Sequence, residues 1–148
     1  MADLSRNNLI FKIKYKCYNF ESRKNGLMHK SKLNEDECCF FKFPYPDYLS
    51  FWNKNVAFDI NVIFIDDNFN IINISELKAG QEKPVSSEEP ATYVVEIISE
   101  NFEKIINFKK INIIKDNFIE FLNNNHKSNF SGNDDFQKIA NTVYKTVR

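Results

Sequence analysis

Hydrophobic and polar residues alternate with a period of two along much of the chain before residue 116. In the clearest segment, 11–17, one side is apolar and the other carries Lys12, Lys14 and Lys16. Such alternation is typical of a strand with one buried face and one face in water. We interpret the lysine row as the solvated face of an outer strand, where lysine also discourages pairing with another chain.

Strand-like runs continue through six further segments, which are residues 38–43, 50–52, 58–66, 69–77, 91–98 and 110–115. Between the last two, Ser99 is a suitable N-cap for a short helix over 100–107. Seven short strands with a single short helix before the last one predict a mainly β fold. That fold is either an antiparallel β-sandwich or an incomplete barrel.

The hydrophobic period changes after residue 115. Residues 116–125 place Phe118, Ile119, Phe121 and Leu122 in one helical stripe. A second amphipathic helix is predicted over 134–148, with an apolar face of Phe136, Ile139, Ala140, Val143, Tyr144 and Val147. We therefore divide the chain into a β domain over 1–115 and a helical C-terminal extension over 116–148.

The stripe of the last helix requires a surface to cover it, because a short isolated helix is marginal in water. That surface is the β domain, a second copy of the chain or another protein. The candidate partner-contact residues are Phe136, Ile139, Val143, Tyr144 and Val147.

Composition and charge narrow the classes of function. The chain has 148 residues, a hydrophobic fraction of 43% and zero formal net charge. That length allows one domain with a buried core, and neutrality disfavours nucleic-acid binding, including along the lysine row. No apolar run reaches the roughly 20 residues that cross a bilayer, and lysines interrupt the N-terminal segment where a signal peptide would be apolar. We expect a cytoplasmic protein without a membrane partner.

Residue usage adds a hint about ancestry. Asparagine, lysine and isoleucine are abundant, whereas the chain has 3 glycines and 4 prolines. This bias is typical of AT-rich coding sequences in some bacteria, protists and phages. If the source is a phage, the virion is the alternative location.

Candidate catalytic and metal-binding chemistry is sparse. Of the three cysteines Cys17, Cys38 and Cys39, two are adjacent and none belongs to a CxxC pattern, and the two histidines lie far apart. We expect reduced, apolar thiols and neither a metal nor another cofactor. The sequence also lacks GxSxG, P-loop and HExxH motifs. An enzyme is therefore not supported.

A compact polar cluster, Trp52 to Val56, directly precedes the strand over 58–66. Alternation traced back from that strand places Lys54 on the apolar side, where a lysine is costly unless it is paired. Two interpretations stay open. In one, Trp52 is a core aromatic, Lys54 extends into solvent and Asn55 closes a turn.

In the other interpretation, the cluster belongs to a small polar-ligand pocket. Trp52 is then a wall, Lys54 lies at the rim, and a carboxylate such as Asp66 or Glu96 is the partner of the lysine. The ligand-binding candidates are Trp52, Lys54, Asn55, Asp66 and Glu96.

Three stretches resemble one known family in order and spacing: NGLMHKSKLNEDECCFFKF, SFWNKNVAFDINVIFIDDNFNIINI and PATYVVEI. The family is domain of unknown function 192, also called uncharacterised protein family 0127, and the resemblance covers about residues 10–115. The matching positions are Gly26, Leu27, Met28, Phe51, Trp52, Lys54, Asn55, Phe64, Ile65 and Asp66. The resemblance implies a mainly β, sandwich-like fold and supplies no biochemical activity.

The chain departs from the family pattern at four positions. Asn53 replaces a methionine, Val56 a threonine, Asp59 a proline and Asn61 an aspartate. An asparagine keeps the shape of aspartate but loses the charge and the ability to act as a base. If family chemistry needs that carboxylate, this member has lost it.

Two functions follow from these observations. The first is a non-enzymatic β-sandwich module that acts through protein–protein contacts, with the C-terminal helices as its docking element in a larger assembly. The alternative is a small polar-ligand-binding protein, or a degenerate enzyme, with a pocket around Trp52, Lys54 and Asn55.

Overall fold

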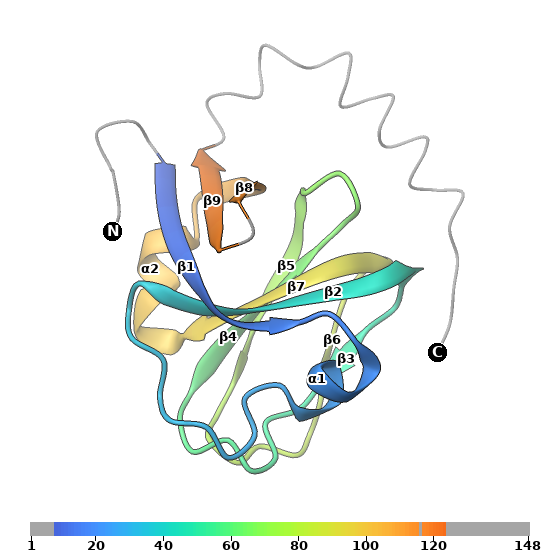
Figure 1. The fold of residues 1–148 in the computed structure, drawn as a ribbon, viewed down its shortest axis with the longest axis vertical. Coiled ribbons are helices and arrows are strands. Elements are labelled where there is room, and N and C mark those ends of the chain that lie inside the picture. Colours follow the sequence, from blue (N-terminus) through green and yellow to red (C-terminus); the bar gives the residue numbers. More distant parts are fainter. Residues whose placement is uncertain (1–7, 116, 124–148) are drawn as a thin grey trace.

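The computed structural model describes residues 8–115 and 117–123, and the fold is mainly β (Figure 1). Seven strands form the main sheet: β1 (Asn8–Cys17), β2 (Glu37–Asp47), β4 (Ile60–Ile65), β5 (Ile71–Leu77), β7 (Ala91–Ile98), β8 (Phe108–Lys115) and β9 (Phe118–Asn123). A separate two-stranded ribbon consists of β3 (Ser50–Phe51) and β6 (Val85–Ser86). The helical segments are α1 (Phe20–Asn25), the 3-10 turn η2 (Ser99–Asn101) and α2 (Phe102–Ile105). Strands occur in all seven predicted segments, and η2 with α2 is the predicted short helix.

The main sheet is a mixed, nearly closed barrel. Its strand order is β5-β4-β7-β2-β1-β9-β8. The two ends of this order approach each other at a bridge between Asn70 and Lys110, where the Ile111 amide donates to the Phe69 carbonyl over 2.8 Å. Register shifts within several strand pairs add the local twist that curls the sheet. The incomplete barrel is thus the better of the two predicted architectures.

The prediction of a wholly antiparallel sheet is wrong at one pair of strands. β1 and β2 run parallel, because residues 18–36, which include α1, cross over between them. β1 is also not an outer strand, since it pairs with β2 on one side and with β9 on the other. Its lysine row is nevertheless exposed, as the alternation predicts.

The predicted helix over 116–125 is wrong where the structure describes this segment. Residues 118–123 form β9, which lies between β1 and β8. Ile119 and Phe121 are fully buried, whereas Glu120 between them is only half-buried. A short apolar run fits both a helical stripe and an alternating strand, and here strand pairing decides between them. The sheet therefore continues past residue 115, and the predicted docking helix over 134–148 lies outside the described residues.

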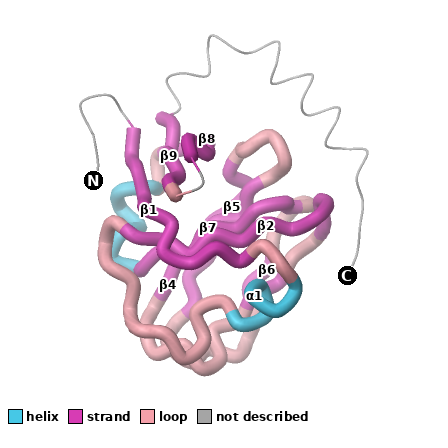
Figure 2. The backbone as a smooth tube through the Cα atoms, in the orientation of Figure 1, coloured by secondary structure: helices cyan, strands magenta, loops and turns pink. Residues whose placement is uncertain are grey.

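Two hydrophobic clusters lie on opposite faces of the central strands. The inner cluster lies inside the curled sheet and consists of Leu9, Phe11, Ile13, Cys38, Phe40, Ile63, Ile65, Val95, Ile97, Ile105, Phe108, Ile111, Ile119 and Phe121. The outer cluster consists of Cys17, Leu27, Leu33, Cys39, Phe41, Leu49, Val56, Phe58, Ile60, Val62, Phe64, Leu77, Ala91, Val94 and Ile98. β8 and β9 close the sheet around the inner cluster, whereas α1 and the β3–β6 ribbon cover the outer cluster (Figures 1 and 2).

Strand alternation assigns neighbouring residues of β7 to different clusters. Val95 and Ile97 belong to the inner cluster, and Val94 and Ile98 belong to the outer one. Glu96 lies between the last two, so its side chain is on the outer face. An ionisable residue is therefore placed in the middle of a strand that is otherwise almost entirely apolar and buried.

Candidate functional site

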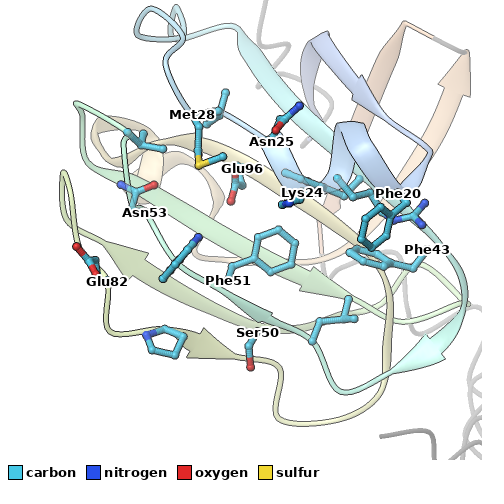
Figure 3. Close-up of a pocket in the computed structure, with 18 residues that line it drawn as sticks. Phe20, Lys24, Asn25, Met28, Phe43, Ser50, Phe51, Asn53, Glu82 and Glu96 are labelled. Atoms are coloured by element: carbon cyan, nitrogen blue, oxygen red, sulfur yellow. The ribbon is translucent and has the colours of Figure 1, made fainter. Parts of the chain in front are cut away.

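A cavity of about 610 Å³ opens on the outer face of the sheet. Its walls come from α1 and the turn after it, from β3 and the residues beyond its end, and from the central strands. Lining residues include Gly26, Leu27, Met28, Phe51, Trp52 and Glu96, and Figure 3 shows Met28, Phe51 and Glu96 among the labelled side chains around the opening. The two most specific motifs of the sequence, Gly-Leu-Met and Phe-Trp-x-Lys-Asn, thus meet at one cavity although they lie far apart in the chain.

The Gly-Leu-Met motif forms the wall that comes after α1. Asn19 caps the start of the helix: its side chain accepts from the Ser22 amide over 2.8 Å, and its own backbone amide donates to the Ser22 Oγ over 3.1 Å. It ends at Gly26, which has φ +47°, and a Cβ at this position would lie 3.3 Å from the Phe41 ring. Glycine is needed here for both the left-handed backbone and the close approach. Met28 then lies on the cavity.

Phe51 and Trp52 form the opposite wall. The Phe51 ring meets the rings of Phe41 and Phe64 edge-on, at centroid distances of 4.9 and 5.9 Å, and this packing holds the wall against the outer cluster. Trp52 is 47% exposed. It is therefore a wall of the cavity and not the core aromatic of the first interpretation.

Asn53, which replaces the family methionine, is almost completely buried at the edge of this cavity. Its Nδ2 donates to the carbonyls of Phe58 and Lys78 at 3.1 and 3.0 Å. Its Oδ1 is buried and has no hydrogen-bond partner among the residues described. Figure 3 shows the amide oxygen on the cavity side and the nitrogen turned away.

Lys54 and Asn55 lie outside the cavity and form an exposed corner. The Lys54 Nζ lies 5.4 Å from the centre of the Trp52 ring, a cation–π contact. Asn55 adopts φ +62°, and its carbonyl accepts from the His29 amide over 2.9 Å. Left-handed backbone at an asparagine is typical of a turn. The outward lysine and the Asn55 turn agree with the first interpretation, whereas the position of Trp52 agrees with the second.

Asp66 lies in the turn between β4 and β5 and does not line the cavity. Its Oδ1 accepts from the amides of Asn68 and Asn70, each at 2.9 Å. Burial raises the pKa of Asp66, and these hydrogen bonds oppose the shift. The carboxylate closes the hairpin, and the structure does not bring it to Lys54.

Glu96 is the one predicted candidate, besides Trp52, that the structure places on the cavity. Its side chain is only 3% exposed, and its strand neighbours are Cys39 on β2 and Val62 on β4. It makes no hydrogen bond or ion pair with the residues described. Burial raises the pKa of Glu96 to about 8, and the nearby Cys17 adds to the shift. At neutral pH the group is therefore mainly a neutral carboxylic acid.

Two thiols lie behind this carboxyl. The sulfur atoms of Cys17 and Cys39 are 3.7 Å apart, and all three cysteines are buried and free. The contact with Cys39 lowers the pKa of Cys17, while burial raises the pKa of Cys39. Cys38 points to the inner cluster instead. In the described ranges, no three His, Cys, Asp or Glu side chains group as metal ligands.

Of the five predicted ligand-binding candidates, Trp52 and Glu96 line the cavity, and their role in binding stays a prediction. Gly26, Met28 and Asn53 also line it and were not among the candidates. The signals for these three were the Gly-Leu-Met motif and the exchange of the family methionine for asparagine. The candidate partner-contact residues of the last helix lie outside the part of the chain that the structure describes.

Comparisons with known proteins agree with this fold. Residues 5–107 match the model of the family DUF192, described as "Uncharacterized ACR, COG1430". A crystal structure of a protein of unknown function from Novosphingobium aromaticivorans is similar with a TM-score of 0.63 and 22% identity, over 68% of this chain and 71% of that chain. A protein from Sinorhizobium meliloti, described as a proposed transcription regulator, is similar with a TM-score of 0.60 and 23% identity, over 64% and 73%. At these identities the likeness shows the fold alone.

No curated protein matches the chain. Among the residues that the structure describes, no helix has the length and apolar character needed to cross a membrane.

Proposed function

The chain belongs to the DUF192 family, and from that premise we propose that its outer cavity binds a small organic molecule with an apolar body and one polar group. The observation that carries this proposal is Glu96, a buried carboxyl that faces the cavity without a partner among the described residues. Burying such a group lowers stability unless something bonds to it. A ligand in the cavity would provide the missing partner.

The cavity walls fit the apolar part of such a ligand. Phe41, Phe43, Phe51 and Trp52 all contribute to the lining, and aromatic walls around a few placed polar groups are typical of small-molecule sites. The cavity volume also falls in the range usual for ligand pockets, roughly 300–1,000 Å³. Apolar burial would therefore supply affinity, and the carboxyl would supply orientation.

The first experiment is a fragment screen read by thermal shift and by fluorescence. Trp52 is the only tryptophan, so its emission reports on the cavity without labelling. We expect small aromatic compounds to raise the melting temperature and to change this emission. Trp52→Ala should then weaken binding by about fivefold, since loss of an aromatic contact costs on the order of 1 kcal/mol.

Lys54→Ala is the matched control for the screen. Lys54 is two residues from Trp52 but outside the cavity, so binding should change by less than about twofold, well under the loss at the wall. Binding to both variants is measured by thermal shift, because Trp52→Ala has lost the tryptophan whose emission would report binding. Compounds that bind both variants as tightly as the parent chain would contradict the proposed site.

The docking function predicted for residues 134–148 stays a prediction, and β9 changes its test. Truncation after Lys115 would remove a strand of the sheet as well as the predicted helix. Truncation after Asn123 keeps β9 and removes residues 124–148 alone. Unchanged self-association by light scattering, or unchanged partner binding, would refute the docking role.

A further inference from the structure

Two acceptor groups at the cavity lack a donor. The Oδ1 of Asn53 has no partner among the described residues, and the Glu96 carboxyl makes no hydrogen bond to them. The orientation of the Asn53 amide is set by its surroundings, because its other end lies against the carbonyls of Phe58, Leu77 and Lys78. An oxygen placed there would meet oxygens only. A ligand that carries hydrogen-bond donors would therefore find two groups able to accept from it.

Two aromatic rings of the cavity wall each lie against a cation of the protein. The Arg23 guanidinium lies 5.1 Å from the centre of the Phe43 ring, and Lys54 lies over Trp52 at 5.4 Å. Both rings line the cavity. Aromatic faces attract cations through the negative potential above the ring, and more strongly where water is excluded. The protein's own cations already use this property at the edge of the site.

We propose that the ligand is an organic cation, a protonated amine on an apolar or aromatic body, and that Glu96 and Asn53 bind its ammonium group. This inference rests on the proposed binding function. The ammonium group would pair with the carboxylate of Glu96, and a shift of the Asn53 side chain, whose Oδ1 is buried in the free chain, would let the ammonium donate a second hydrogen bond there. An ion pair of this kind compensates the burial of both charges, whereas either charge alone would be costly.

Binding then includes a balanced proton transfer. Free Glu96 is mainly a neutral acid below a pKa of about 8, and the bound form pairs a carboxylate with the ammonium ion. The proton of Glu96 leaves to solvent, so each amine bound below that pKa releases up to one proton. Amine affinity should consequently rise with pH up to this pKa.

Other ionisable groups around Glu96 do not supply the missing cation. Cys17 on β1 and Cys39 on β2 are thiols, and any negative charge on Cys17 opposes ionisation of Glu96. Arg23 on α1 lines the cavity but donates to the carbonyls of Tyr18 and Lys42, each at 3.0 Å. Two exposed residues at the opening remain: Lys24, which competes with a cationic ligand, and Glu82, which attracts one.

The experiment compares three probes of one shape and different charge: 2-phenylethylamine, 2-phenylethanol and phenylacetate. Each is titrated into the full chain at several pH values, with Trp52 emission as the readout. We expect the amine to bind best, and its affinity to rise by up to about tenfold for each pH unit below the Glu96 pKa of about 8. Calorimetry in two buffers of different ionisation enthalpy should show proton release for the amine alone.

Three variants locate the effect. Glu96→Gln should abolish both the pH dependence and the proton release, and Glu82→Gln, the control at the exposed rim, should keep both. Asn53→Met restores the family residue and should weaken the amine and 2-phenylethanol, which both carry a donor, while leaving phenylacetate nearly unaffected. Amine binding with the same pH dependence in Glu96→Gln would overturn the inference.

The probes also separate this inference from the proposed function. Binding of the alcohol or of phenylacetate, without the amine, would overturn the cationic ligand and leave the binding function standing. Absence of binding by all three at millimolar concentration, together with an empty fragment screen, would overturn both.

Discussion

The two faces of the central strands have the same backbone and differ in how they are covered. The inner face is closed by the curl of its own sheet, where the Phe121 ring meets those of Phe11 and Phe108 edge-on at 5.4 and 6.4 Å. The outer face is covered by α1, by loops and by the β3–β6 ribbon, which leave a cavity with Glu96 in it. Closure of a sheet upon itself buries side chains completely, whereas separate short segments leave gaps.

This difference separates stability from function within one sheet. A packed interior tolerates few voids and few unpaired polar groups. The outer face has both, because Asn53 and Glu96 each present a polar group without a donor among the described residues. We therefore expect core substitutions to act mainly through the inner face and ligand effects to arise on the outer face.

The largest expected effect tests this separation directly. Phe121→Ala on the inner face should lower the free energy of unfolding by about 3–5 kcal/mol, since the ring is fully buried and its loss leaves a cavity. Phe51→Ala on the outer face should cost less than half of that, because the new space joins a cavity that water can enter. Urea denaturation of both variants measures the difference. Equal losses would contradict the contrast between the two faces.

A second prediction concerns the pH dependence of stability. The pKa of Glu96 is raised to about 8 from an ordinary value of 4.5, so the folded chain keeps a proton that the unfolded chain releases. The free energy of unfolding should fall as pH rises between these values, by at most about 1.4 kcal/mol per pH unit. Glu96→Gln removes this loss. The variant should resemble the parent chain at the acid end of the window and exceed it increasingly toward the upper end.

The control for that measurement is Glu82→Gln, an exposed carboxyl at the same cavity. Its stability should match that of the parent chain throughout the window. Parallel curves for the parent chain and Glu96→Gln would show that the buried carboxyl does not hold its proton.

Smaller effects are expected at the two glycines with positive φ, Gly26 at the cavity wall and Gly80 outside it. Gly80→Ala should cost about 1–2 kcal/mol for left-handed backbone alone, because φ is +72° and a Cβ would meet nothing within 4 Å. Gly26→Ala should cost more, since φ is +47° and the new Cβ would also press on the Phe41 ring. Thermal denaturation of the pair isolates the steric part. A milder loss at Gly26 would mean that the Phe41 ring yields freely.

The smallest effect is expected at the rim. Lys54→Ala should change the free energy of unfolding by less than about 1 kcal/mol, the usual value of an exposed cation–π contact. The free energy of unfolding is measured by urea denaturation for Lys54→Ala, for Trp52→Ala and for the double variant. Additive losses would show that Lys54 contributes independently of the Trp52 ring. A larger loss for Lys54 alone would place it inside the site.

Runs of apolar residues were sufficient to predict strands in seven segments, whereas β6 and β9 were not predicted. They could not predict the parallel pairing of β1 and β2, which depends on the crossover through α1. The six residues of that helix bury no side chain, so they have no apolar stripe to detect. The capping pair Asn19 and Ser22 was the available signal. β9 was misassigned because its apolar run is short enough to fit either period.

The candidate site was predictable only where a residue type is unusual in its place. Trp52 is unique in the chain, and Glu96 is an acid within an apolar strand. The unpaired oxygen of Asn53 depends on carbonyls from Phe58 and Lys78, which only the folded chain brings together. The proposed pairing of Lys54 with a carboxylate is not formed, since the turn at Asn55 directs the lysine over Trp52.

The central claim is that Glu96 is buried as a neutral acid at a ligand cavity, and its titration tests this most directly. The carboxyl carbon of Glu96 can be tracked by NMR across the pH range and assigned by its absence in Glu96→Gln. We predict a midpoint near 8 that falls when a cationic ligand binds. A midpoint at the ordinary value of 4.5 would mean that the carboxyl is solvated or paired in the free chain, and would contradict the account.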